Sequence, residues 1–164
     1  MRYLPQSILD ISPKKHVGSF SRHRASIMAA RLGMSLSDED LRYAAFHEAG
    51  HAVVARFFGL PVGDHLEIAD DGIGKTKIGS ADQLPVSDQI TVCLAGVAAQ
   101  DLFGFSRPET GYADHGKIIG LIEGLTKAKS LKLRNAAYAR AREIIKNQKL
   151  EVEWLGELLI KERS

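Results

Sequence analysis

Apolar and polar positions repeat with two different periods along the chain, and each period predicts a different kind of element. Over residues 38–58 the apolar positions recur every three or four residues, which is typical of a helix that is largely buried. Ser37 stands before three acidic residues and predicts a capped helix start, while Gly59 and Pro61 predict the end. The stripe consists of Tyr43, Phe46, Gly50, Val53, Val54, Phe57 and Phe58.

After Pro61 the pattern becomes that of a hairpin. Residues 65–69 alternate as a half-buried strand does, residues 70–72 are an Asp-Asp-Gly turn signal, and residues 74–78 are read as the returning strand. Helical spacing then returns, and it predicts four more helices, over residues 88–103, 114–124, 131–147 and 149–162. The expected fold is therefore mainly α within the α+β class, with one small hairpin.

The boundaries of the folded domain are expected at residues 37 and 164. Residues 1–36 are read as an N-terminal arm with a short helix over 22–32. The two last helices have apolar stripes that we expect to be core or, around Trp154, a subunit contact. The stripe residues are Leu131, Ala137, Ala141, Ile144, Ile145, Trp154, Leu155, Leu158 and Leu159.

Composition narrows the class of protein. With 164 residues, 45% hydrophobic and 26% charged, the chain matches one globular domain and excludes a disordered, collagen-like or disulfide-scaffold protein. The single cysteine, Cys93, is expected in the core and cannot form an internal disulfide, which favours a reducing, cytoplasmic location. The longest uncharged apolar run, residues 90–99, is about half of a membrane helix, so we expect no membrane span.

Charge gives no sign of a nucleic-acid partner. The formal net charge is only +2. Two stretches, residues 11–37 and 127–149, are locally basic, but neither lies beside a recognised nucleic-acid-binding motif. We interpret both as solvated surface and expect no nucleic acid to bind.

Residues 47–51, His-Glu-Ala-Gly-His, carry the candidate chemistry. His47 and His51 are four residues apart, so on a helix they share one face and can hold one zinc ion. Glu48 stands beside the open coordination position, where it can take a proton from a zinc-bound water. The pattern lies within an apolar helix, so these polar groups need partners there. Zinc-dependent hydrolysis is the chemistry that this pattern favours.

A third protein ligand must come from elsewhere in the chain. The histidine of the extended metzincin pattern would fall at position 57, which is Phe57, so that class is excluded. Glu67 is an early candidate, but it lies in a strand pattern rather than on a helix. The later acidic candidates are Asp82, Asp88, Asp101, Glu109 and Asp114.

Three segments in order resemble the FtsH-type ATP-dependent zinc proteases. FHEAGHAVVARFFG at 46–59 resembles their active-site helix, LAGVAAQDLFG at 94–104 their AGRAAEELxFG helix, and TGYADHGKI at 110–118 the TGAxxD segment that supplies their third zinc ligand. The resemblance extends over about residues 41–162. It implies a mainly helical peptidase domain, with zinc held by His47, His51 and Asp114 and with Glu48 as the general base.

The chain departs from the family pattern in three places. Only two residues separate the Thr-Gly pair from Asp114, so strict counting would select His115, which is an equally competent ligand. Gln100 stands where the family has a glutamate, which alters any support that this side chain gives to a ligating histidine. The ATPase module and the membrane helices of the family have no counterpart here.

Two functions follow as hypotheses. The first is a stand-alone zinc metallopeptidase that acts on peptides or unfolded proteins, with unfolding left to a separate unfoldase or adaptor. The second is a zinc-stabilised binding or regulatory module with the peptidase fold and little turnover. Peptidase domains of the family assemble as rings, so the resemblance also implies a homo-oligomer.

Overall fold

The computed structural model describes residues 37–69, 74–105 and 112–163, and it is mainly helical with a small antiparallel sheet, as predicted. The expected arm over 1–36 and the turn over 70–72 lie outside the described residues. The helices are α3 (Asp38–Phe57), α4 (Val86–Phe103), α5 (Tyr112–Leu121), α6 (Lys127–Asn147) and α7 (Lys149–Arg163), and the strands are β1 (Val62–Ile68) and β2 (Gly74–Ile78). Each agrees with its prediction to within a few residues.

Helix α3 begins and ends for the local reasons seen in the sequence. The Ser37 side chain accepts a hydrogen bond from the Asp40 backbone N–H at 3.1 Å, which satisfies a donor that the first turn leaves unpaired. Three acidic residues follow in that first turn. At the other end Gly59 has a φ of 72°, a left-handed conformation that releases the chain toward β1.

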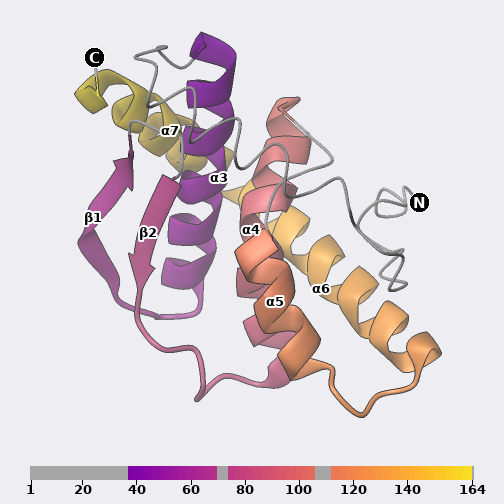
Figure 1. Cartoon of the computed structure of the whole chain (residues 1–164). Coiled ribbons are helices and arrows are strands. Elements are labelled where there is room, and N and C mark those ends of the chain that lie inside the picture. The colour runs from indigo at the N-terminus through magenta and orange to yellow at the C-terminus, as the bar shows by residue number, and fades with distance from the viewer. Residues whose placement is uncertain (1–36, 70–73, 106–111, 164) are drawn as a thin grey trace.

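Helix α4 is the centre of the core. It packs most extensively against α6 and α3, and Figure 1 shows it between them with α5 alongside. Every residue from Ile90 to Gln100 is buried. The α3–α4 contact is close because Gly50 lacks a side chain: a Cβ there would lie 2.6 Å from Ala99 Cβ and 2.7 Å from the Ala95 carbonyl oxygen.

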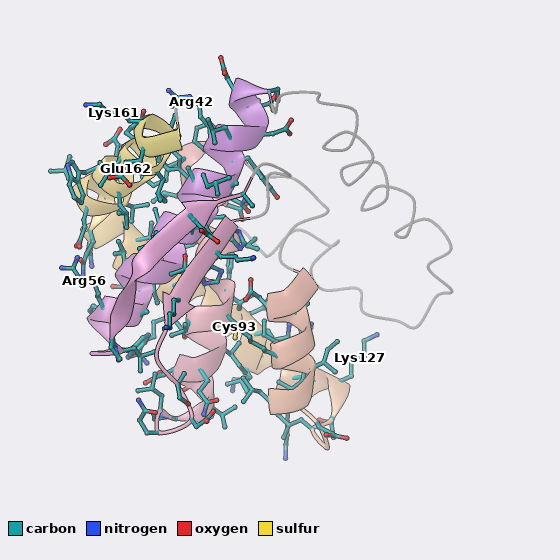
Figure 2. The ribbon with its side chains drawn as sticks, turned by 60° about the vertical axis from the view of Figure 1, so that its left-hand side comes forward. Arg42, Arg56, Cys93, Lys127, Lys161 and Glu162 are labelled. Carbon is teal, nitrogen blue, oxygen red and sulfur yellow. The ribbon has the colours of Figure 1, made fainter. Side chains whose placement is uncertain are left out.

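Helix α7 runs antiparallel to α3. Arg42, near the start of α3, pairs with Glu157 at 2.7 Å, and Arg56, near its end, pairs with Glu151 at 2.5 Å. Figure 2 labels the two arginines at opposite ends of α3. Between the two ion pairs, Gly156 of α7 packs against the ring of Phe46 on α3.

The β1–β2 hairpin covers one side of α3, away from α6 (Figure 1). The strands are antiparallel, with Leu66 opposite Thr76 and Ile68 opposite Gly74, and the register is irregular between Val62 and Leu66. Alternate residues of β2 therefore face inward: Gly74, Thr76 and Ile78 are partly buried, while Lys75 and Lys77 are exposed. This alternation decides which side chains of β2 reach α3.

Phe57 and Leu131, which we expect to be buried, are exposed, and so is Trp154, for which we expect either a core position or a subunit contact. Trp154 is 63% exposed because α7 buries the stripe through Val152 and Leu159, and Trp154 points to the opposite side. Phe57, 51% exposed, is the last residue of α3, and its ring contacts Phe58. Leu131, 38% exposed, precedes the buried part of α6.

Cys93 is buried, as predicted. Among the residues described, no helix combines the length and the apolar character needed to cross a bilayer.

Candidate metal centre

Two helices bring three candidate ligands together. His47 and His51 lie one turn apart on α3, and Asp114 lies in the first turn of α5, which packs on α4. The two Nε2 atoms are 3.1 Å apart, and Asp114 Oδ2 is 3.2 Å from His51 Nε2 and 3.5 Å from His47 Nε2. Within the described segments this is the one group of three or more such side chains whose ligand atoms converge.

The triangle formed by these atoms has the size that zinc requires. Tetrahedral ligands at about 2.0–2.1 Å from zinc lie roughly 3.3–3.4 Å from one another. The observed separations of 3.1, 3.2 and 3.5 Å bracket that value. Two imidazole nitrogens and one carboxylate oxygen are also a donor set that zinc accepts, with a fourth position left for water or substrate.

Hydrogen bonding fixes the direction of the His51 lone pair. His51 Nδ1 lies 2.9 Å from the Val92 carbonyl oxygen, which can only accept, so Nδ1 carries the hydrogen. In neutral His51 the Nε2 lone pair then faces the Asp114 carboxylate, which is also an acceptor. Two acceptors at 3.2 Å need a cation between them, either a proton on His51 or a metal ion.

The pKa shifts of His51 and Asp114 also indicate that a positive charge is favoured between them. Burial lowers the pKa of His51, but the Asp114 carboxylate, the Glu48 carboxylate and the Val92 carbonyl together outweigh burial, and the net pKa is raised. Burial raises the pKa of Asp114, but the two imidazoles hold it well below its usual range. Both shifts favour a positive charge between the imidazoles and the carboxylate.

A space in α4, rather than a hydrogen bond at Nδ1, accommodates the His47 ring. A Cβ at Gly96 would lie 2.5 Å from both ring nitrogens of His47, so the imidazole occupies the place of a side chain. The Nδ1 atom of His47 is buried and has no hydrogen-bond partner among the residues that the structure describes. Gly96 belongs to the LAGVAAQDLFG segment, so the close packing gives a physical reason for a glycine at this point.

Glu48 points into the hairpin side of α3. Only 7% of the residue is exposed, and its carboxylate is near enough to His51 to contribute to the raised pKa of that imidazole. The Thr76 hydroxyl donates a hydrogen bond to Glu48 Oε2. Nothing in the local sequence of β2 marks this partner, because only the register of the hairpin brings Thr76 to α3.

The alternative third ligands lie elsewhere. His115 follows Asp114 on α5, where burial and Arg134 lower its pKa, and it is not among the converging ligands. Glu67 is exposed on β1, and Asp82 is exposed after β2. Asp88 pairs with Arg140 at 2.6 Å, Asp101 accepts a hydrogen bond from Tyr138, and Glu109 lies outside the described residues.

The Gln100 side chain reaches the backbone of α3. Its Nε2 donates to the Tyr43 carbonyl oxygen at 3.0 Å, one turn before His47 on α3. The direct support to the histidines comes from Val92 and from the space at Gly96. The neutral side chain at position 100 therefore contacts the backbone of the helix that carries both histidines.

Comparison with known proteins gives weak and partial similarity to one group. No family model matches the chain. An ATP-dependent zinc metalloprotease FtsH 1 from Sorangium cellulosum is 28% identical over 135 residues, which cover 74% of this chain and 21% of that protein. An ATP-dependent zinc metalloprotease FtsH from Methylibium petroleiphilum is 36% identical over 93 residues, which cover 48% of this chain and 14% of that protein. The chain thus matches about a fifth or less of the length of these relatives.

Proposed function

We propose that this chain is a zinc-dependent metallopeptidase that cleaves short or unfolded polypeptides. The observation that supports this most strongly is the convergence of His47, His51 and Asp114 with Glu48 alongside, on a chain similar to zinc metalloproteases. Zinc held by the three ligands would polarise a peptide carbonyl and lower the pKa of a water molecule in the site. Glu48 would accept the proton of the attacking water and deliver it to the departing amine.

Strand β2 offers a place for the substrate backbone. Within the described residues its pairing is with β1 alone, so its other edge can accept an extended peptide by strand addition. A shallow hollow over the two strands is lined by Glu67 of β1 and by Lys75, Thr76 and Lys77 of β2. Because Thr76 also contacts Glu48, a peptide on this edge would lie next to the proposed general base.

The substitution Glu48→Gln tests the reaction, with zinc content as its control. We expect peptide hydrolysis to fall about 10²- to 10⁴-fold, the usual contribution of a general base, while zinc stays near one ion per chain. Hydrolysis would be followed by mass spectrometry on a peptide library and zinc by elemental analysis. An equally active Glu48→Gln protein would contradict the proposal, and a wild type without turnover would favour the binding or regulatory module.

The ligand set is tested by a matched pair of neighbouring substitutions. Asp114→Ala should remove most of the bound zinc, whereas His115→Ala should retain it, because only Asp114 faces the histidines. Loss of zinc with His115→Ala alone would give the site a different third ligand. Failure of the wild type to bind added zinc would overturn the metallopeptidase assignment.

A further inference from the structure

The general base of a hydrolase must be held in one conformation. The Glu48 side chain has three rotatable bonds, and rotation about any of them would move its carboxylate out of that conformation. Its two neighbours in the motif are oriented by α4, through the Val92 carbonyl and the space at Gly96. The Glu48 carboxylate is instead contacted from the opposite side, by the Thr76 hydroxyl of β2. The hairpin therefore has a role at the site that the motif itself does not reveal.

Strand β2 contacts Glu48 with two inward-facing residues. The Thr76 hydroxyl donates to Glu48 Oε2, and a Cβ at Gly74 would lie 2.6 Å from Oε1 and 2.8 Å from Cδ. One carboxylate oxygen is thus hydrogen-bonded and the other is packed against bare backbone. Because Glu48 is 7% exposed, little bulk water is available to replace this hydrogen bond.

We propose that Thr76 is a positioning residue that holds the Glu48 carboxylate toward the metal site, in a space that Gly74 leaves open. This inference rests on the proposed function, because it assigns Thr76 a role in turnover. It also gives β2 two tasks, since the strand that would receive the peptide backbone is the strand that orients the base. If β2 were displaced or paired in another register, the protein would lose both peptide binding at the strand and the orientation of the Glu48 carboxylate.

A purely structural role for Thr76 predicts something different. Thr76 Oγ1 also lies 3.2 Å from the Glu48 backbone carbonyl oxygen, and a hydrogen bond to that atom would only tie the strand to the helix. The two acceptors can be separated by a double-mutant cycle, because Glu48→Ala removes the carboxylate and leaves the carbonyl in place. The cycle can be measured on the free energy of unfolding, so it needs no catalytic activity.

The stability cycle compares Thr76→Val in the wild-type and Glu48→Ala backgrounds, by chemical denaturation of the metal-free protein. If the hydroxyl acts on the carboxylate, Thr76→Val should destabilise the wild type clearly more than it destabilises Glu48→Ala. Thr91→Val is a matched control, since the buried Thr91 hydroxyl donates to the Ser87 carbonyl within α4. Its effect should be the same in both backgrounds. Equal effects of Thr76→Val in the two backgrounds would overturn the proposal.

Kinetics on the zinc-loaded protein test the role in turnover. Thr76→Val should lower kcat about 10- to 100-fold, the range for a hydrogen bond to a charged group, with KM within about threefold and zinc content unchanged. Thr76→Ser keeps the hydroxyl and should restore most of kcat. Gly74→Ala should also lower kcat with zinc retained, because its Cβ displaces the Glu48 carboxylate.

The outcomes separate the positioning role from the proposed function. Coupling in the stability cycle, a fall in kcat with Thr76→Val and rescue by Thr76→Ser would together support the positioning role. Unchanged kcat in Thr76→Val, or no rescue by serine, would overturn it while leaving the peptidase intact. A zinc-loaded wild type that cleaves no peptide would overturn the proposed function, and a coupled Thr76–Glu48 pair would then be structural only.

Discussion

Gly96→Ala probes the position of His47 without replacing any of the proposed ligands. The new Cβ would lie 2.5 Å from both ring nitrogens, roughly 1 Å closer than the 3.4 Å at which ordinary van der Waals contact begins. The imidazole is the end of a side chain, so it can rotate away while α3 and α4 stay packed. Zinc ligand distances tolerate only about 0.2 Å, so a displacement of this size should remove His47 from the ligand set.

The expected loss in zinc affinity is large compared with the expected change in fold stability. Substitutions that disturb only the partners of a ligand already cost 10- to 100-fold in affinity, so losing His47 itself should raise the zinc Kd at least about 100-fold, or about 2.7 kcal/mol. The gain in helix propensity from glycine to alanine, up to about 1 kcal/mol, offsets part of any strain. The metal-free protein should therefore melt within about 4 °C of the wild type.

Competition titration against a chromophoric zinc chelator would give the Kd, and thermal melting with and without zinc would give the stability. Gly120→Ala is the matched control, because Gly120 is an exposed glycine on α5, and beyond its own stretch of helix no described atom lies within 4 Å of the added Cβ. It should keep wild-type zinc affinity. Wild-type affinity in Gly96→Ala would refute the reasoning, as would a metal-free melting temperature lowered by more than about 10 °C, since the ring would then not be free to move.

Two further predictions concern the packing of α3 and the effect of pH. Gly50→Ala should destabilise the fold by about 2 kcal/mol in urea denaturation, because its Cβ meets the Ala95 carbonyl oxygen, which is backbone and cannot rotate away; an unchanged midpoint would contradict this. The raised pKa of His51 stabilises the metal-free protein fully below about pH 6.5, and this stabilisation is lost as pH rises through the folded-state pKa. The lowered pKa of Asp114 favours folding at every pH between 6 and 8, so it does not change over this interval. Burial lowers the pKa of His115, so this residue favours folding as pH rises and opposes the contribution of His51; the comparison therefore uses His115→Ala as its background. In that background the metal-free protein should melt higher at pH 6 than at pH 8, while the rise in melting temperature caused by zinc should grow over the same interval, because zinc replaces the His51 proton. A zinc effect that is independent of pH would argue against these ligands.

Much of the fold could be predicted because the signals are local. Ser37, the periodic apolar positions and Gly59 delimit α3, and α4 ends at residue 103, as predicted, where Gly104 follows with a φ of 81°. Trp154 shows the limit of the same reasoning. It belongs to an apolar segment of α7, but which side of a helix is buried depends on where its neighbours pack.

The candidate site divides in the same way. His47 and His51 could be placed on one face from their spacing, because four residues make about one helical turn. Asp114 could be selected from other acids only by resemblance, since the proximity of α5 to α3 is decided by how both pack on α4. The contacts of Thr76, Gly74 and Val92 could not be predicted, because they depend on strand register and helix crossing. Zinc binding itself stays a prediction.

The separation of the ligands along the chain has a consequence for folding. His51 and Asp114 are 63 residues apart, and the residues between them include the hairpin and α4. A zinc ion that joined them would be a cross-link that closes this loop. For a disulfide over a loop of that length, the chain-entropy relation gives about 4 kcal/mol of stabilisation. The metal would then reduce the conformational freedom of the unfolded chain in addition to its role in hydrolysis. Its removal would release α5 from a direct link to α3.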